Sequence, residues 1–406
     1  MLPLVLYAGS VAMERIFGIT ALMGGNRFMA TTVMCVALGI IGGIYAIFGG
    51  LKAVAVSDSL NGIIFIIGAV ILIPVLAFIA LGDGSIAEGI RIFATSSPEH
   101  LNAIQPADAQ PPYIPWPMIV LGCGINHISY WCTNQSIMQR VLGAKNLKEA
   151  QKGSLLTGLT CVFCPIFLVA PGVIQFIRDG GVLTDFDMAY PSLIKDILPT
   201  PVLGFFAAVM FGAILSSFNS VLNSASTMFT LDLYRSSINP QASDTKCVKV
   251  GKIYGTIAGC VAIVISPFVM YAGGITTFLN SMSQFVSLPV LCTILGIFMF
   301  KRIPKYMPKV ITVFHVVCYG AFLLIKPCYP GSSNPIHYLY AMAVLFPIEL
   351  LIMWYLNKYR PGEEYEIHDV GAVDLTPWKY RHVVSIIGLI IAVAIYILFS
   401  PLGIAA

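Results

Sequence analysis

The chain is 406 residues long, and 57% of its residues are hydrophobic while only 10% are charged. Because a soluble globular domain carries about 25% charged residues, this composition excludes an ordinary soluble protein and predicts a polytopic membrane protein. The net charge of +4 excludes no class of membrane protein by itself. The distribution of the charges among the loops is more informative, because it indicates the orientation in the membrane.

Eleven segments are long and apolar enough to cross a bilayer, which takes roughly 20 residues per helix. They lie at about 2–22, 28–48, 59–81, 116–138, 154–177, 202–232, 251–272, 276–300, 309–325, 336–356 and 382–404. The first begins without a basic region and is followed by no cleavage site, so we do not expect a signal peptide. No soluble domain is expected between the spans.

Lysine and arginine are distributed unevenly between the two sets of loops. Seventeen of the 23 lie in one set, and five lie in the other, with Arg15 inside the first span. The rich set consists of the loops at 50–58, 140–152, 234–252, 301–309 and 357–381. Because basic loops remain on the cytoplasmic side, this distribution places the rich set in the cytoplasm and runs the last span outward.

The sixth span, within Ala207–Arg235, has a polar face. Projected at about 100° per residue, one half of the helix carries Ser216, Ser217, Asn219, Ser220, Asn223, Ser224, Ser226, Thr227 and Thr230. Such a face must point toward protein partners or a wet cavity. Close helix packing is one explanation, because small polar residues favour it. However, this face carries more polar residues than packing needs, and its oxygens suit a hard cation such as sodium.

Three stretches resemble motifs of the sodium/solute symporters, the family of the sodium/glucose cotransporters. The segment AILSSFNSVLNSASTMFTLDLYR, which begins at Ala213, is similar to the family's eighth core helix. The stretch Gly49–Gly62, GGLKAVAVSDSLNG, resembles its glycine-glycine-leucine…aspartate signature. The stretch Tyr130–Gly153, YWCTNQSIMQRVLGAKNLKEAQKG, resembles its aromatic-Gln-Arg-Ala-Lys segment. Their order and approximate spacing also match. The resemblance continues weakly through the C-terminal helices, so it covers nearly the whole chain.

The resemblance implies an all-α membrane fold built on two inverted five-helix repeats, within one transmembrane domain. Residues 1–81 would form the remainder of the first repeat, 116–300 the second repeat, and 301–406 peripheral helices. The first two core helices would then be missing, which leaves three alternatives open. In the first, the chain is a fragment or begins at a wrongly assigned start codon. In the second, it is a transport-inactive remnant or a membrane scaffold. In the third, it is a smaller symporter that works without these helices.

The resemblance also implies a sodium site. The family pattern Ala-x-x-Ser-Ser is present, and it assigns the Ala213 carbonyl and the Ser216 and Ser217 hydroxyls as sodium ligands. One helical turn separates Ala213 from Ser217, so the groups can converge, although a serine hydroxyl can also bond back to its own helix. The family uses the aspartate at the position of Asp58 for sodium coupling and gating; a helix N-cap is the other interpretation.

A solute site is expected around the fourth span, where Gly122 and Gly124 lie among polar residues and suggest a locally unwound helix. Tyr130 matches the gating tyrosine of the sugar carriers, but three other sugar-contact positions differ. These positions hold His127, Cys161 and Ser281, with Asn280 and Gln284 close to the last. A galactose- or glucose-type pocket is therefore not supported. His127 is expected either to donate a hydrogen bond to the solute or to form a hydrogen bond between helices.

Other features predict packing rather than chemistry. Cys161 and Cys164 form a CxxC within an apolar run without a second pair, so we expect them to be buried apolar residues. The adjacent Glu14 and Arg15 are expected to form an ion pair or to lie at the membrane interface. No nucleotide, nucleic-acid or hydrolase motif is present, and we do not expect an enzyme.

The sequence thus predicts a sodium-coupled symporter of a small organic solute, in the cytoplasmic membrane of a bacterium. Sugars, polyols, small carboxylates and vitamins all remain open as the solute.

Overall fold

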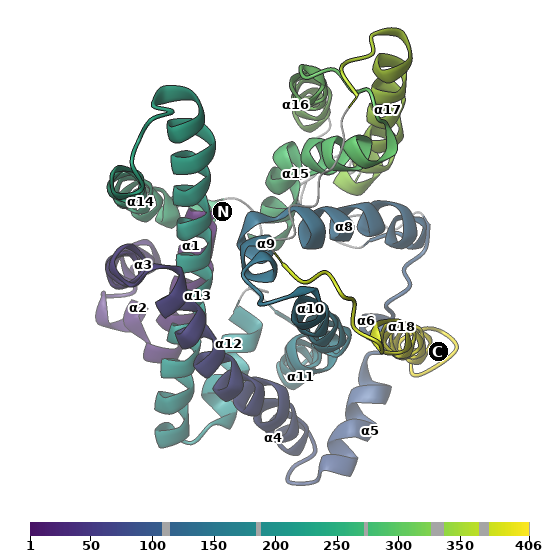
Figure 1. The fold of residues 1–406 in the computed structure, drawn as a ribbon. Coiled ribbons are helices and arrows are strands. Elements are labelled where there is room, and N and C mark those ends of the chain that lie inside the picture. The colour runs from purple at the N-terminus through teal and green to yellow at the C-terminus, as the bar shows by residue number, and fades with distance from the viewer. Residues whose placement is uncertain (108–113, 184–187, 272–274, 326–336, 365–372, 406) are drawn as a thin grey trace. The chain divides into compact units, whose positions relative to one another are not determined.

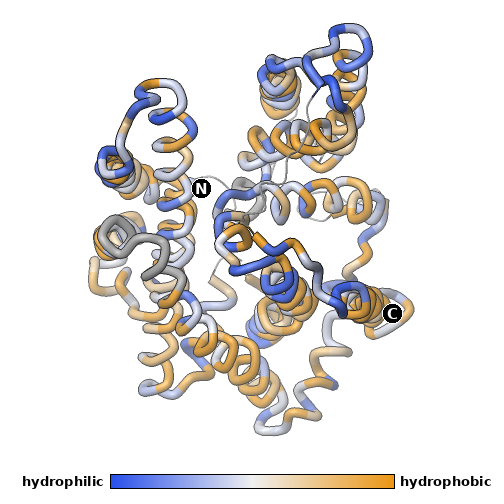
Figure 2. Tube along the Cα trace, in the orientation of Figure 1, coloured by the Kyte–Doolittle hydropathy of each residue, from blue (hydrophilic) through white to orange (hydrophobic). Residues whose placement is uncertain are grey.

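The computed structural model describes residues 1–107, 114–183, 188–271, 275–325, 337–364 and 373–405; side chains within these ranges are described except at 46–55, 57, 275–279 and 325. The regular secondary structure of the described residues is helical, apart from one isolated bridge between Gln105 and Pro115, and turns and irregular segments connect the helices. Hydrophobic residues run along most helices, and hydrophilic residues concentrate at the turns between them (Figure 2).

The helices form two compact units, which are described separately. Unit 1 consists of residues 1–102, 158–275 and 391–406, and unit 2 of residues 103–157 and 276–390. The helices α10 (Leu147–Val162) and α18 (Arg381–Leu398) each contribute residues to both units.

Unit 1 is assembled around the long helix α13 (Thr200–Met228), which α1, α3 and α14 contact (Figure 1). Its other helices are α1 (Leu2–Phe17), α2 (Ile19–Leu22), α3 (Arg27–Phe65), η1 (Ile66–Leu72), α4 (Ile73–Leu81), α5 (Ile86–Ser96), α6 (Pro98–Leu101), η3 (Pro165–Val169), α11 (Ala170–Arg178), α12 (Ala189–Ile197), η5 (Phe229–Ile238), α14 (Asp244–Ile265) and η6 (Ser266–Tyr271).

Two glycines bring α13 close to its neighbours. A Cβ atom on Gly9 of α1 would lie 2.4 Å from Ile214, and one on Gly42 of α3 would lie 2.9 Å from Phe218. Since real Cβ contacts are never this short, glycine permits these approaches, as small residues do between membrane helices. The close packing fixes the rotation of α13 about its own axis, and therefore the direction of its polar face.

Unit 2 packs α16 and α17 against each other, and both contribute to one apolar core with α15 (Figure 1). Its helices are α7 (Trp116–Met118), η2 (Ile119–Cys123), α8 (Gly124–Thr133), α9 (Gln135–Leu142), α15 (Ile275–Met299), α16 (Met307–Ile325) and α17 (Tyr338–Tyr359). Leu288, Tyr319 and Leu339 are fully buried members of this core.

Within the described residues, eight helices are long and apolar enough to span a membrane, or nine if the bent pair Leu147–Val162 and Pro165–Arg178 is one span. The sequence predicts eleven. Two of the expected spans fall short of the length criterion: α1 has only 16 residues, and the segment at 116–138 is divided among α7, η2, α8 and α9.

Candidate functional site

The predicted sodium ligands lie on α13, where the helix is regular. The Ser217 side chain is exposed, whereas Ala213 and Ser216 are half-buried. Within the described part of the chain, neither the Ser216 hydroxyl nor the Ser217 hydroxyl makes a hydrogen bond. Both oxygens are therefore available to a ligand, one helical turn from the Ala213 carbonyl.

Three other hydroxyls on the polar face bond back to the helix itself. Ser220 donates to the Ser216 carbonyl at 2.7 Å, Ser224 donates to the Ser220 carbonyl at 2.7 Å, and Thr227 donates to the Asn223 carbonyl at 2.9 Å. The alternative interpretation, in which serine satisfies its own helix, therefore holds for these residues and not for Ser216 and Ser217.

Asn219 is the residue on this face that sequence reasoning did not single out. Its side chain is fully buried, yet neither atom of its carboxamide has a hydrogen-bond partner in the described structure. Leaving a buried polar group unpaired costs about 1–3 kcal/mol. The available signal was its position, one turn after Ser216 on the same face.

Asp58 lies on α3 and is half-buried. Three residues further along this helix, the Asn61 amide lies against the α13 backbone, 2.8 Å from where a Cβ atom on Gly212 would stand. The start of the third predicted span therefore lies beside the residue that precedes Ala213. Within the Gly49–Gly62 motif, the side chains of residues 49–55 and 57 lie outside the described residues.

The solute-site candidates on α8 occupy two faces of that helix. Ser129 is buried and donates its hydroxyl to the Ser287 carbonyl of α15 at 2.8 Å. His127 and Tyr130 are exposed on the other face, where Tyr130 packs edge-to-face on Trp131 with ring centroids 5.5 Å apart. The α8 helix thus packs on α15 with one face and presents an imidazole and aromatic rings on the other.

The expected unwinding of this span is wrong in detail. Residues 119–123 form the π-helix η2, and α8 continues directly from it. The chain therefore stays helical here, and this turn packs closely against α17 at Gly122, where a Cβ atom would lie 2.6 Å from Leu339. A π-helical turn still leaves backbone groups less regularly bonded than an α-helix does, and such turns recur at functional sites.

Gln284 and Ser281 are both buried on α15. The Gln284 carboxamide donates from Nε2 to Asn126 Oδ1 at 2.7 Å, which joins α15 to α8. Its Oε1 atom has no hydrogen-bond partner in the described structure. The structure therefore brings Gln284 together with the residue next to His127, and it leaves one buried acceptor open.

Cys161 belongs to unit 1, whereas the other four predicted solute contacts belong to unit 2, so a common site of these five residues remains a prediction. The prediction that the CxxC cysteines are buried is wrong for Cys161, which is exposed, while Cys164 is half-buried. The reason is that residues 160, 161 and 163 lie on an outward face of this helical segment.

Glu14 and Arg15 do not pair with each other. Glu14 is buried, while Arg15 is exposed and donates from Nε to the Ser192 hydroxyl of α12 at 3.1 Å. Both line a cavity of about 390 Å³, to which Asp179 also contributes. The ion-pair alternative is therefore wrong, because both residues instead line a polar cavity between α1 and α12; their position at the membrane interface remains a prediction.

The helical fold, with eight or nine helices in the described residues that are long and apolar enough to span a membrane, places the chain in the class of polytopic membrane proteins. Its structure is similar to that of a Na⁺-coupled sialic acid symporter in a substrate-bound, outward-open state, with a TM-score of 0.64 and 20% sequence identity. The match covers 90% of this chain and 75% of that one. This likeness confirms the expected inverted-repeat symporter fold.

Sequence comparison gives the family. The profile of the sodium:solute symporter family matches residues 4–306. The chain is 36% identical to the uncharacterized symporter YidK of Escherichia coli K12, over 99% of this chain and 69% of YidK. It is 28% identical to the sodium/myo-inositol cotransporter 2 of Bos taurus, over 93% of this chain. The chain belongs to the sodium:solute symporter family, and it spans 59% of the length of that cotransporter.

Proposed function

We propose that this chain carries out sodium-coupled symport of a small, neutral, polyhydroxylated solute across the cytoplasmic membrane. The observation that carries the proposal is the polar face of α13, where the Ser216 and Ser217 hydroxyls are free of hydrogen bonds within the described structure. Asn219 supports it, because its fully buried carboxamide lacks partners on the same face. Sodium is one of the two transported species, and Ala213, Ser216 and Ser217 are its proposed ligands.

Asp58 is the proposed coupling residue. Asn61 of the same helix lies against α13 at Gly212, so a change at the sodium ligands can be transmitted to α3 by direct contact. Sodium binding would stabilise the outward-open form and raise the affinity for the solute. By thermodynamic linkage, the solute must raise the affinity for sodium by the same factor.

The class of solute is inferred from the groups around α8 and α15. His127, Tyr130, Gln284 and Ser281 offer hydrogen bonds and an aromatic face, and neither helix contains a lysine or an arginine. Buried polar groups select solutes that pair with them, and an anion is best matched by a basic residue. A neutral polyol or sugar is therefore favoured over a carboxylate, in line with the relatives named for myo-inositol and glucose.

A thermal-unfolding screen tests this assignment directly. The purified protein is heated with a panel of polyols, sugars and carboxylates, in sodium chloride and in choline chloride. A ligand that binds the folded protein raises its melting temperature, and we expect a neutral polyhydroxylated solute to do so more strongly in sodium. A stabilising solute whose effect is the same in both salts would contradict sodium coupling.

A further inference from the structure

Three backbone carbonyls of α15 accept hydrogen bonds from side chains of other helices. The Ser281 carbonyl accepts from the Tyr319 hydroxyl at 3.0 Å, the Gln284 carbonyl from His315 Nε2 at 3.0 Å, and the Ser287 carbonyl from the Ser129 hydroxyl at 2.8 Å. These carbonyls recur every three residues, so they follow one side of the helix. The segment 281–287 is thus attached to α16 and to α8 at each successive turn.

The sequence explains why this segment needs outside support. Pro289 lies inside α15, and proline has no N–H group with which to bond the carbonyl four residues earlier. That carbonyl belongs to Phe285, which lies between the anchored carbonyls of Gln284 and Ser287. A proline inside a helix weakens and bends it at that turn. The side-chain donors from α16 and α8 stabilise the turn that leads into Pro289.

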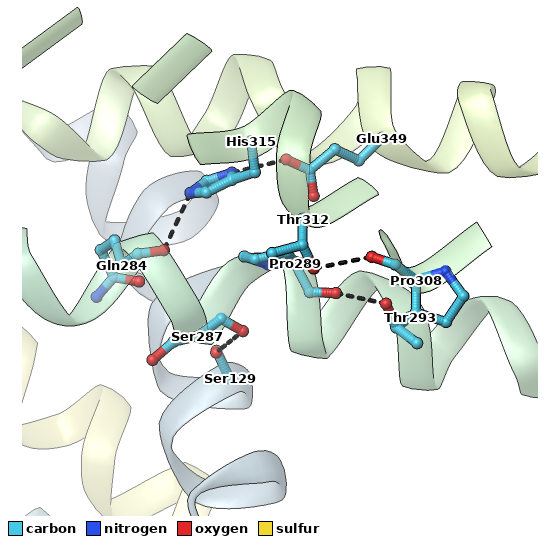
Figure 3. A network of polar contacts seen from close by, with 9 residues as sticks. All are labelled: Ser129, Gln284, Ser287, Pro289, Thr293, Pro308, Thr312, His315 and Glu349. Carbon is cyan, nitrogen blue, oxygen red and sulfur yellow. Dashed lines mark hydrogen bonds and ion pairs between the residues drawn. The ribbon is translucent and has the colours of Figure 1, made fainter. Parts of the chain in front are cut away.

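His315 belongs to a buried pair with Glu349 of α17 (Figure 3). Both side chains are 0% exposed, and Nδ1 of the histidine lies 2.7 Å from Oε1 of the glutamate. A carbonyl can only accept a hydrogen bond, so Nε2 must carry a hydrogen toward Gln284. The Nδ1–Oε1 contact then shares a single proton, and the pair has no net charge wherever that proton lies. Such a pair avoids the cost of an uncompensated charge inside a membrane protein.

The groups packed around this pair do not compete for that proton. The Cys292 thiol of α15 lies beside the Glu349 carboxylate, and the Tyr319 ring stacks on His315 with centroids 5.3 Å apart. No lysine, arginine or further carboxylate contacts the pair within the described residues. The pair is therefore built to hold the Gln284 carbonyl in place.

Holding this carbonyl also fixes the Gln284 side chain. Its Nε2 donates to Asn126 Oδ1 at 2.7 Å and to the Asn280 carbonyl at 3.1 Å, which leaves Oε1 as a buried acceptor with no partner in the described structure. An acceptor oriented in this way discriminates strongly for a solute that presents a hydroxyl at the matching position.

We propose that the His315–Glu349 pair is a positioning device for solute selection. By anchoring the turn before Pro289, it orients the Gln284 carboxamide, so that Oε1 accepts a hydrogen bond from one particular hydroxyl of the solute. His315, Glu349 and Tyr319 are positioning residues that do not touch the solute. This inference rests on the proposed function, and it adds an explanation of how the protein selects one hydroxyl of the solute.

The test combines hydrogen exchange with uptake. In Glu349→Ala, Nδ1 of His315 loses its partner, whereas in Glu349→Gln the amide can donate to it. We expect Glu349→Ala to speed amide exchange across 281–288 at least tenfold, and Glu349→Gln to restore slow exchange.

Tyr319→Phe removes only one of the anchoring hydrogen bonds and should produce a smaller effect, so it can replace Glu349→Ala if that variant does not fold. Thr312→Val is the matched control, because its hydroxyl bonds only the Pro308 carbonyl of its own helix (Figure 3).

Uptake of myo-inositol, D-glucose and their single-deoxy analogues into proteoliposomes provides the functional readout. We expect Glu349→Ala to raise KM at least tenfold for the parent solute and to abolish discrimination against one deoxy analogue, with unchanged sodium half-saturation and with recovery in Glu349→Gln. A purely structural role would lower the maximal rate and leave this discrimination intact, and that result would overturn the inference alone. Absence of sodium-driven uptake of every probe by the unchanged protein would overturn the proposed function as well.

Discussion

At the scale of single residues, the hydroxyls of α13 fall into two groups that differ in their hydrogen bonds. Ser220, Ser224 and Thr227 bond back to carbonyls of their own helix. Ser216 and Ser217 do not do so within the described structure. The sequence could not separate the two groups, because both contain the same residue types on the same face, and only the side-chain rotamers distinguish them.

Replacing Ser217 by alanine should therefore weaken sodium binding rather than the fold. Losing one oxygen ligand of a cation costs on the order of 1.5 kcal/mol, so the sodium concentration for half-maximal uptake should rise about tenfold. The control is Thr227→Val, which loses only a bond to its own helix. Sodium titration of solute uptake is the measurement, and equal curves for the two variants would contradict the assignment.

Asn219 offers a prediction in which stability and function change in opposite directions. Replacing a buried, unpaired amide by an apolar residue of similar size removes an unsatisfied group, so Asn219→Leu should raise the melting temperature measured without sodium. The same variant should lose much of the stabilisation that sodium gives the unchanged protein. If Asn219→Leu instead melts earlier in both salts, the carboxamide has a structural partner and takes no part in the sodium site.

At the scale of helices, the sequence predicted most of the membrane spans, because a long apolar run has few alternatives in a bilayer. The sixth predicted span, 202–232, corresponds to α13, Thr200–Met228, which continues into η5. The short helices α5, α6 and α12 were not predicted, because they lie in connections and are too short to give a clear periodic pattern. The π-helical turn η2 was also beyond the sequence, since the glycines of this span suggested unwinding and the close contact of η2 with α17 joins residues far apart in the chain.

This contact yields a test of packing at Gly122. Adding a Cβ atom there would require Leu339 or its helix to move, since the two atoms would stand 2.6 Å apart. Overpacking of this kind costs about 1–3 kcal/mol, so Gly122→Ala should lower the melting temperature by several degrees. Gly124→Ala is the matched control, because nothing lies within 4 Å of its Cβ position. Equal melting temperatures for the two variants would show that α17 does not pack at Gly122.

At the scale of the whole molecule, the family and its fold were accessible from sequence, because three motifs keep their order along the chain and the family profile matches residues 4–306. The candidate solute site was accessible only in part. Gln284 meets Asn126 across two helices that are 158 residues apart in the chain, and no local pattern specifies that meeting. The division into a partial first repeat, a second repeat at 116–300 and peripheral helices remains a prediction.

Charge distribution predicts the orientation of the molecule in the membrane. The loop at 234–252 belongs to the basic set, which is expected in the cytoplasm, whereas the connection at 82–115 is expected on the other side. In a background without native cysteines, a cysteine at Glu99 should react with a membrane-impermeant maleimide in intact cells. A cysteine at Ser237 should react only after the cells are opened. Labelling of both positions in intact cells would refute this topology.

The central claim is that the polar face of α13 couples sodium to solute movement. The most direct measurement is uptake of a solute identified by the thermal screen into proteoliposomes with an inward sodium gradient, an inward potassium gradient or no gradient. The account predicts transient accumulation above equilibrium only with the sodium gradient, together with solute-dependent entry of ²²Na⁺ that Ser217→Ala suppresses. Equal uptake under sodium and potassium, or uptake in Ser217→Ala with unchanged sodium dependence, would contradict it.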